Sequence, residues 1–291
     1  MGFAKFLVKS ALRNRSMWFW GVFFILFWIA LGAYIYPKGA VNIIQYGAAD
    51  VARLYTADWL TWAAIYMPTG VMVGYLYMLV YSTGAVPYLI RFGRLRPLKY
   101  LLSYYVAMTA SSLIFTAVVA AIAIPMMWHG LNYNGLHVPI DSVLPASAAG
   151  ALGFVGSAAL GAVFTTSFMF LVFLLALRMP KHTTRIAFIP MVIYFASYYS
   201  YLYGVVPRDA IALVPFVSLV GLGVGTYAGY GDAPTQLMPD ISYGRFAAPP
   251  TVPAWQVAAG ALAWIAALAA LSVAIIGRIR YESPELLRAE M

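Results

Sequence analysis

The sequence has 291 residues, of which 63% are hydrophobic and only 9% are charged. Soluble domains have about a quarter of their residues charged, so this composition excludes a water-soluble globular protein. The sequence contains no cysteine, which excludes disulfides, thiolate metal sites and a cysteine nucleophile. The formal net charge of +9 would suit a nucleic-acid-binding protein, but the basic residues are confined to loops and termini, as membrane topology requires.

Apolar runs of about twenty residues, the length of helix that crosses a bilayer, recur along the chain. They predict an all-α membrane protein with six transmembrane helices, at residues 17–36, 60–81, 101–128, 146–177, 186–206 and 254–277. Fourteen of the eighteen Lys and Arg residues lie in the N-terminus, the loops after the second and fourth runs, and the C-terminal tail. Because cytoplasmic segments are rich in these residues, we expect a multi-pass protein of the plasma membrane with both termini in the cytoplasm.

The first sixteen residues, 1–16, predict an amphipathic helix that lies on the cytoplasmic leaflet. Basic residues recur every four positions on one face and apolar residues gather on another: Lys5, Lys9 and Arg13, against Phe3, Phe6 and Leu7. A solvated basic tail is the alternative interpretation, since few apolar residues define the second face.

Residues 207–250 predict an extracellular hairpin and loop before the last span. Within them, Ala210 to Gly225 is apolar but short for a crossing, and it contains Pro215 and three glycines. A seventh crossing would also place the basic tail outside the cell. We therefore expect a re-entrant helical hairpin or an interfacial helix on the outer face, tolerated because protein buries its broken backbone.

The interiors of the six apolar runs contain no Asp, Glu, Lys, Arg or His, which argues against a proton relay through the membrane. No Walker A, GxSxG or HExxH sequence occurs either. His129 and His137, with Asp141 nearby, can be imagined to share a metal ion, but their spacing fits no known ligand pattern and favours solvated loop residues. We therefore expect no metal, no bound cofactor and no enzymatic activity in this chain, and any transport must draw its energy from another subunit.

Two segments carry a resemblance to a known family: RNRSMWFWGVFFILFWIALGAYIY at residues 13–36 and TGAVPYLIRFGRLRPLKYLLSYY at residues 83–105. Together with the predicted hairpin, they resemble the permease subunits of ATP-binding-cassette exporters of the second membrane-domain type. The resemblance covers nearly the whole chain. In one respect the chain departs from that family, because residues 83–99 contain no Asp or Glu, and this leaves the subfamily and the substrate open.

The resemblance implies that residues 84–99 form a cytoplasmic coupling segment in which Leu89 to Leu95 is a helix that seats in a separate ATPase subunit. Arg91, Phe92 and Arg94 would be its contacts, and arginine and aromatic residues are enriched in protein interfaces. The alternative is that these arginines only enforce topology and bind anionic lipid headgroups. The implied partners are an ABC ATPase that binds ATP and Mg, a second permease subunit and membrane lipids, but no nucleic acid.

Tyrosines recur at helical spacing on the second and fifth apolar runs, and the resembled family lines its central path with these spans. The candidate path residues are Tyr66, Tyr77, Tyr194 and Tyr198. Tyrosine offers a flat apolar face and a hydroxyl, although it also populates the interfacial belts of membrane proteins. The fourth run presents small residues at steps of three and four, Gly150, Gly153, Ser157 and Gly161, which predict close helix packing.

The leading hypothesis from the sequence is a transmembrane permease subunit of an ATP-driven ABC exporter that works as a dimer. The alternative is a non-transporting membrane anchor or assembly subunit of a larger membrane complex.

Overall fold

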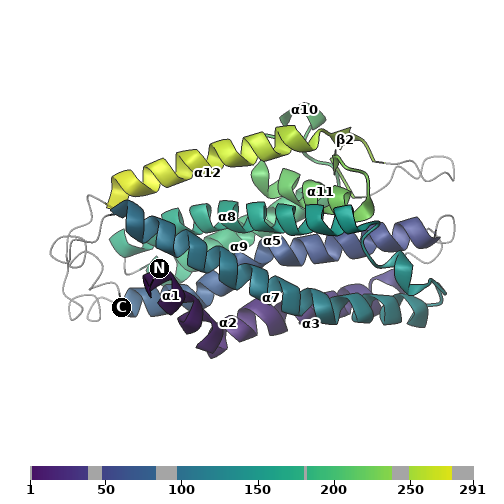
Figure 1. Cartoon of the computed structure of the whole chain (residues 1–291), viewed down its shortest axis with the longest axis horizontal. Helices are drawn as coiled ribbons and strands as arrows, with labels where there is room; N and C mark the ends of the chain where they lie inside the picture. Colours follow the sequence, from purple (N-terminus) through teal and green to yellow (C-terminus); the bar gives the residue numbers. More distant parts are fainter. Residues whose placement is uncertain (1, 39–47, 83–96, 180–181, 238–248, 277–291) are drawn as a thin grey trace.

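A computed structural model describes residues 2–38, 48–82, 97–179, 182–237 and 249–276. The described chain forms an elongated bundle whose long helices run along its length (Figure 1). One pair of very short antiparallel strands accompanies the helices, β1 (Ala233–Pro234) with β2 (Thr251–Val252). The helices are α1 (Gly2–Arg13), α2 (Arg15–Trp18), α3 (Phe24–Tyr34), α5 (Ala48–Ser82), α7 (Pro97–Tyr133), α8 (Ala148–Arg178), α9 (Thr183–Leu202), α10 (Arg208–Ile211), α11 (Pro215–Ala228) and α12 (Ala254–Ile276).

Four helical segments are long and apolar enough to cross a membrane: Arg15–Tyr34, Leu102–Tyr133, Ala148–Ala176 and Ala254–Ile275. They confirm a membrane protein with transmembrane helices at the first, third, fourth and sixth predicted positions. The first of them joins α2 to α3 through a π-helical turn at Phe19–Phe23. At the second and fifth positions α5 and α9 are helical, but neither is among the four segments found within the residues that the structure describes.

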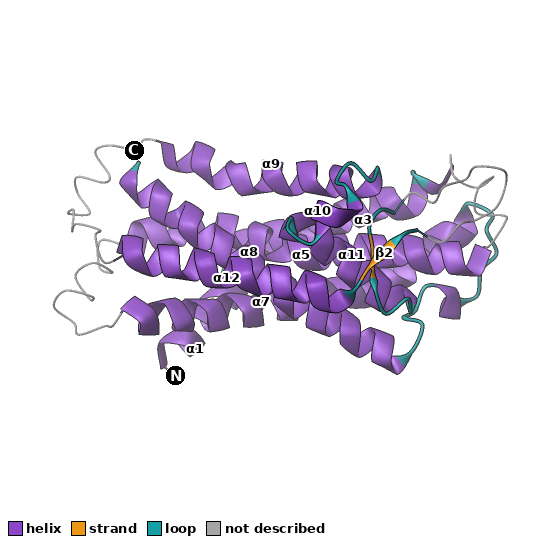
Figure 2. Ribbon diagram, turned by 90° about the horizontal axis from the view of Figure 1, so that it is seen from above, coloured by secondary structure: helices purple, strands orange, loops and turns teal. Residues whose placement is uncertain are grey.

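The central helix of the bundle is α5. Every residue from 56 to 71 is buried, which is expected of a helix that is covered on all sides. Around it pack α2, α3, α7, α8, α9 and α11. Figure 2 shows α12, α8 and α9 running along the same long axis, with α10 and the strands away from the end that carries α1.

The predicted N-terminal helix is present as α1, and it packs on α7. Its contact residues are Leu7 and Ala11, both buried, while Lys5 and Lys9 are exposed. Phe6, which the sequence placed on the apolar face, is 62% exposed instead, because the buried stripe follows the spacing of four residues from Leu7 to Ala11.

The broken apolar stretch before the last helix forms α10 and α11, joined at 212–214. Nearly all of α11 is buried by other helices, so protein covers this short helix as the sequence predicted. A side chain at Gly225 would collide with the carbonyl oxygen of Asp232, and one at Gly223 would collide with Thr61 of α5. The helix ends at Gly229, whose φ of +88° is the left-handed conformation that favours glycine.

The small-residue face of α8 packs against α11 and α5, which confirms the close packing predicted from its spacing. A Cβ atom at Gly150 would lie 2.8 Å from the carbonyl oxygen of Thr226, and one at Gly161 would lie 3.0 Å from Ile65. Gly156 lies off this face, and a Cβ there would meet nothing within 4 Å.

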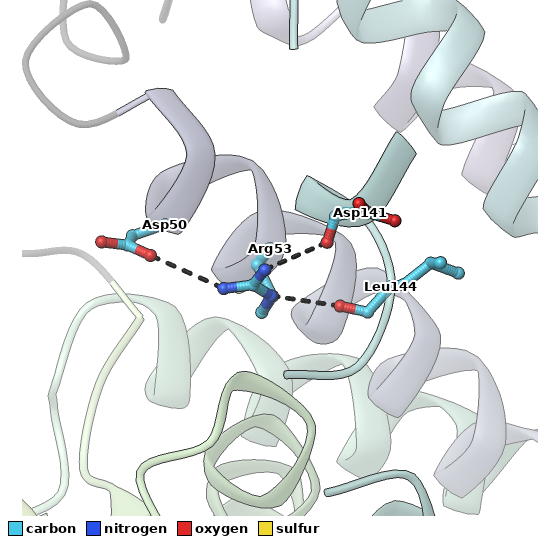
Figure 3. Close-up of polar contacts among 4 residues, drawn as sticks. All are labelled: Asp50, Arg53, Asp141 and Leu144. Carbon is cyan, nitrogen blue, oxygen red and sulfur yellow. Dashed lines mark hydrogen bonds and ion pairs between the residues drawn. The ribbon is translucent and has the colours of Figure 1, made fainter. Parts of the chain in front are cut away.

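Arg53, near the start of α5, holds the loop between α7 and α8. Its Nη2 donates to the carbonyl oxygen of Asp141 over 3.0 Å and its Nε to that of Leu144 over 3.1 Å. Nη1 lies 3.6 Å from Oδ1 of Asp50, as Figure 3 shows. Two guanidinium nitrogens of Arg53 therefore tie this loop to the central helix, and the third pairs with Asp50 on the same helix.

Within the described residues, most basic side chains lie at one end of the bundle and the exposed aspartates lie at the other, together with Lys38, Arg53 and Arg208. The exposed lysines Lys5 and Lys9 lie on α1, and Lys99 lies in the first turn of α7. These helix ends are at the opposite end of the bundle from β1 and β2 (Figure 1). Asp50 and Asp141 lie at the start of α5 and in the loop after α7, which belong to the strand end.

Candidate functional site

Two rows of aromatic and polar side chains face each other across the contact between α5 and α9. On α5 the row repeats every four residues, and on α9 it repeats at four and then three, so each row occupies one helical face. The two rows, which we call the α5–α9 seam, consist of Asp58, Trp62 and Tyr66 on α5, and Tyr194, Tyr198 and Tyr201 on α9. All six side chains are less than 9% exposed.

Two tyrosine hydroxyls connect the helices across the seam. The hydroxyl of Tyr198 donates a hydrogen bond to Oδ2 of Asp58. The hydroxyl of Tyr194 donates to the backbone carbonyl of Trp62 over 3.0 Å. These contacts hold α9 against the central helix at two successive levels.

The aromatic rings fill the space between these two levels. Trp62 and Tyr66 are stacked, with ring centroids 5.2 Å apart and planes at 19°. Tyr194 meets Tyr66 edge-on at 5.4 Å, and Phe195 lies 5.8 Å from the same ring. Offset and edge-to-face arrangements of this kind add to the energy of simple burial. The seam is therefore closed in this conformation.

Several buried polar atoms in and beside the seam have no hydrogen-bond partner among the described residues. They are Oδ1 of Asp58, the hydroxyl of Tyr201, the indole nitrogen of Trp62 and the hydroxyls of Thr56 and Thr61. Most buried polar atoms in native proteins are paired, and each exception calls for a physical reason. Unpaired groups concentrated beside a buried carboxyl make this seam the candidate functional site.

Asp58 also lacks a positively charged neighbour within the described chain. The ion pair found there joins Arg53 to Asp50, not to Asp58. Five residues separate Arg53 from Asp58, which places them about 140° apart around an α-helix. Arg53 is directed to the loop after α7, so it does not neutralise the buried carboxyl.

The structure brings three of the predicted path residues together: Tyr66, Tyr194 and Tyr198 all lie in the seam. Tyr77 falls on the C-terminal half of α5, and its side chain lies outside the described part of the structure. The predicted coupling residues Arg91, Phe92 and Arg94, with the rest of residues 84–96, also lie outside the described residues.

Asp58 is the residue that the sequence interpretation missed. The second span was predicted to begin near residue 60, which left Asp58 outside it, whereas α5 begins at Ala48 and buries the carboxyl in its third turn. The six predicted runs contain no Asp, Glu, Lys, Arg or His, but Asp58, which precedes the second run, is buried inside the bundle. The signal was present, because the tyrosine face of this helix, extended toward the N-terminus in steps of four from Tyr66, reaches Trp62 and then Asp58.

Of the two histidines weighed as metal ligands, His137 is an exposed loop residue as predicted, and His129 is not. His129 lies within α7 and not in a loop, and its Nδ1 is 3.1 Å from the hydroxyl of Tyr34. Within the described ranges, no group of three His, Cys, Asp or Glu side chains lies close enough to hold a metal ion.

Comparison with protein-family models, with curated proteins and with solved structures found no match to this chain. The likeness to exporter permeases thus stays a prediction, and the shown conclusion is a helical membrane protein with a buried carboxyl and tyrosine cluster at its centre.

Proposed function

We propose that this chain is the transmembrane permease subunit of an ATP-driven ABC exporter, and that the α5–α9 seam is part of the substrate path. The observation that supports this most is the concentration of paired and unpaired polar groups in that seam. Polar and ionisable side chains are costly inside a bilayer, and in membrane proteins they mark pathways for substrates and ions.

In this proposal α5 and α9 cross the membrane together with the four apolar segments, which makes six crossings. The exposed lysines of α1 and α7 face the cytoplasm, and α10 and α11 form a re-entrant hairpin on the outer side of the plasma membrane. The excess of basic side chains at one end of the bundle supports this orientation. The burial of α11 supports the hairpin, since a broken helix at membrane depth must be covered by protein.

The energy in this proposal comes from partner subunits that bind ATP and Mg. They would dock on the helix formed by Leu89 to Leu95, through Arg91, Phe92 and Arg94, and a second permease subunit would complete the path. Closure of the ATPase subunits would then increase the population of conformations in which α5 and α9 are apart.

Purification of the tagged protein from its native membranes tests the proposal. We expect an ATPase subunit to copurify, and we expect the double variant Arg91→Glu/Arg94→Glu to lose it. Arg208→Glu is the matched control, because Arg208 is exposed on α10 in the predicted outer hairpin. Absence of any ATPase, or retention of it by the double variant, contradicts the proposal and favours the membrane anchor.

A further inference from the structure

Asp58 is the only carboxyl within the described ranges that is buried at the centre of the bundle, at 1% exposure. It lies ten residues into α5, which corresponds to about 15 Å along the helix axis. One of its oxygens accepts a hydrogen bond from Tyr198, and the other has no partner. Packing alone does not account for a carboxyl at this buried position.

An ionised carboxylate is unfavourable in these surroundings. The free energy of burying a charge is high unless an opposite charge and several hydrogen bonds compensate it, and Asp58 has one hydrogen bond and no positive partner. A protonated carboxyl removes that penalty and still accepts the hydrogen bond from Tyr198. The closed seam therefore favours the neutral acid.

The neighbouring groups do not offer another source of positive charge. The titratable groups that face Asp58 are tyrosines: Tyr55 on α5, and Tyr194, Tyr198 and Tyr201 on α9. Of the other described helices packed on α5, α3 and α11 contain no Asp, Glu, Lys, Arg or His, and α8 has only Arg178, at its last position. The charged or titratable groups Lys99 and His129 lie near the two ends of α7. Arg15 of α2 and Asp141 of the short turn at Ile140–Ser142 are both exposed.

We propose that Asp58 is a buried proton-binding site, and that it exchanges its proton with water only when α5 and α9 separate. On separation the O–H bond of the carboxyl breaks, the electron pair stays on the carboxylate, and the proton passes to a water molecule that enters the seam. Return of a proton allows the helices to close. Raising the pH therefore favours the open seam, because the closed form binds one more proton. This site does not depend on whether ATPase subunits drive transport.

Infrared spectroscopy of the purified protein in lipid at neutral pH tests the site directly. We expect the C=O stretching band of a protonated carboxylic acid, and we expect Asp58→Asn to lack it. Asp209→Asn, which alters an exposed acid on α10, should keep it. In Tyr198→Phe the band should shift to higher frequency because the hydrogen bond to the carboxyl is lost. This shift reports on Asp58 even if Asp58→Asn fails to fold.

Two further measurements, in deuterated buffer and in sodium chloride, distinguish a bound proton from a bound sodium ion. In deuterated buffer the band should shift slowly, in step with opening of the seam, and replacement of choline chloride by sodium chloride should leave it unchanged. Absence of the band from the parent protein, its persistence in Asp58→Asn, or its loss on addition of sodium would overturn the proposal. The last result would assign the site to a sodium ion instead.

Discussion

Tyr198 and Tyr201 lie about one turn apart on α9 and both are buried, yet only the hydroxyl of Tyr198 has a partner. Tyr198→Phe leaves an oxygen of Asp58 unpaired in a buried site, and we expect the free energy of unfolding to fall by about 1–3 kcal/mol. Tyr201→Phe removes a hydroxyl that makes no hydrogen bond, so stability should be unchanged or slightly higher. Thermal denaturation of both variants in detergent measures the difference. Equal losses in the two variants would show that the hydrogen bond to Asp58 contributes little.

At the residue scale the sequence predicted the tyrosines of the seam but not the acid between them. Tyr66, Tyr194 and Tyr198 stand out because a helical repeat of one residue type is visible along the chain. Asp58 lies at the edge of an apolar run, where an acid is ordinary, and only the three-dimensional cover of α5 by its neighbours buries it. Hydropathy cannot register such burial, because it depends on residues distant in the sequence.

The contact between α8 and α11 depends on the absence of a side chain at Gly150. Gly150→Ala would force a Cβ against the backbone of Thr226, and we expect a loss of about 1–3 kcal/mol in stability from overpacking. Gly156→Ala on the same helix meets open space and removes backbone freedom from the unfolded chain, so it should stabilise by about 0.5–1 kcal/mol. Unfolding midpoints of the pair in one detergent give the comparison. If both alanines stabilise, α8 and α11 are not packed this closely.

Among the elements, continuous apolar helices were predicted with nearly correct ends, and irregular elements were predicted only in outline. The runs at 146–177 and 254–277 became α8 and α12 with shifts of one or two residues, because their signal is local and sustained. A broken backbone was predicted for Ala210 to Gly225, but the position of the break at residues 212–214 and the pairing of β1 with β2 were not. Those strands are two residues long, and their paired residues are seventeen and nineteen positions apart, so no sequence periodicity predicts them.

The orientation proposed for the whole molecule has α1 and α10 on opposite sides of the membrane. The sequence contains no cysteine, so maleimide labelling of this protein reports only on a cysteine that is introduced by substitution. Cysteine introduced by Arg208→Cys should react with a membrane-impermeant maleimide in intact cells, and cysteine introduced by Lys9→Cys should react only after permeabilisation. Both original side chains are exposed, so neither change disturbs the core. Labelling of both positions in intact cells would contradict the predicted orientation.

In the proposed permease, the seam between α5 and α9 opens during the transport cycle. This opening is tested by the rate at which the Tyr194→Cys variant reacts with N-ethylmaleimide. The rate is measured in native membranes that contain the copurifying ATPase, with and without ATP and Mg. Ala123→Cys on α7 is the control, because Ala123 is fully buried and lies outside the seam. We expect the cysteine at position 194 to react faster during ATP turnover, while the cysteine at position 123 stays protected. Equal protection of both cysteines under turnover would contradict it and leave the seam as a static core.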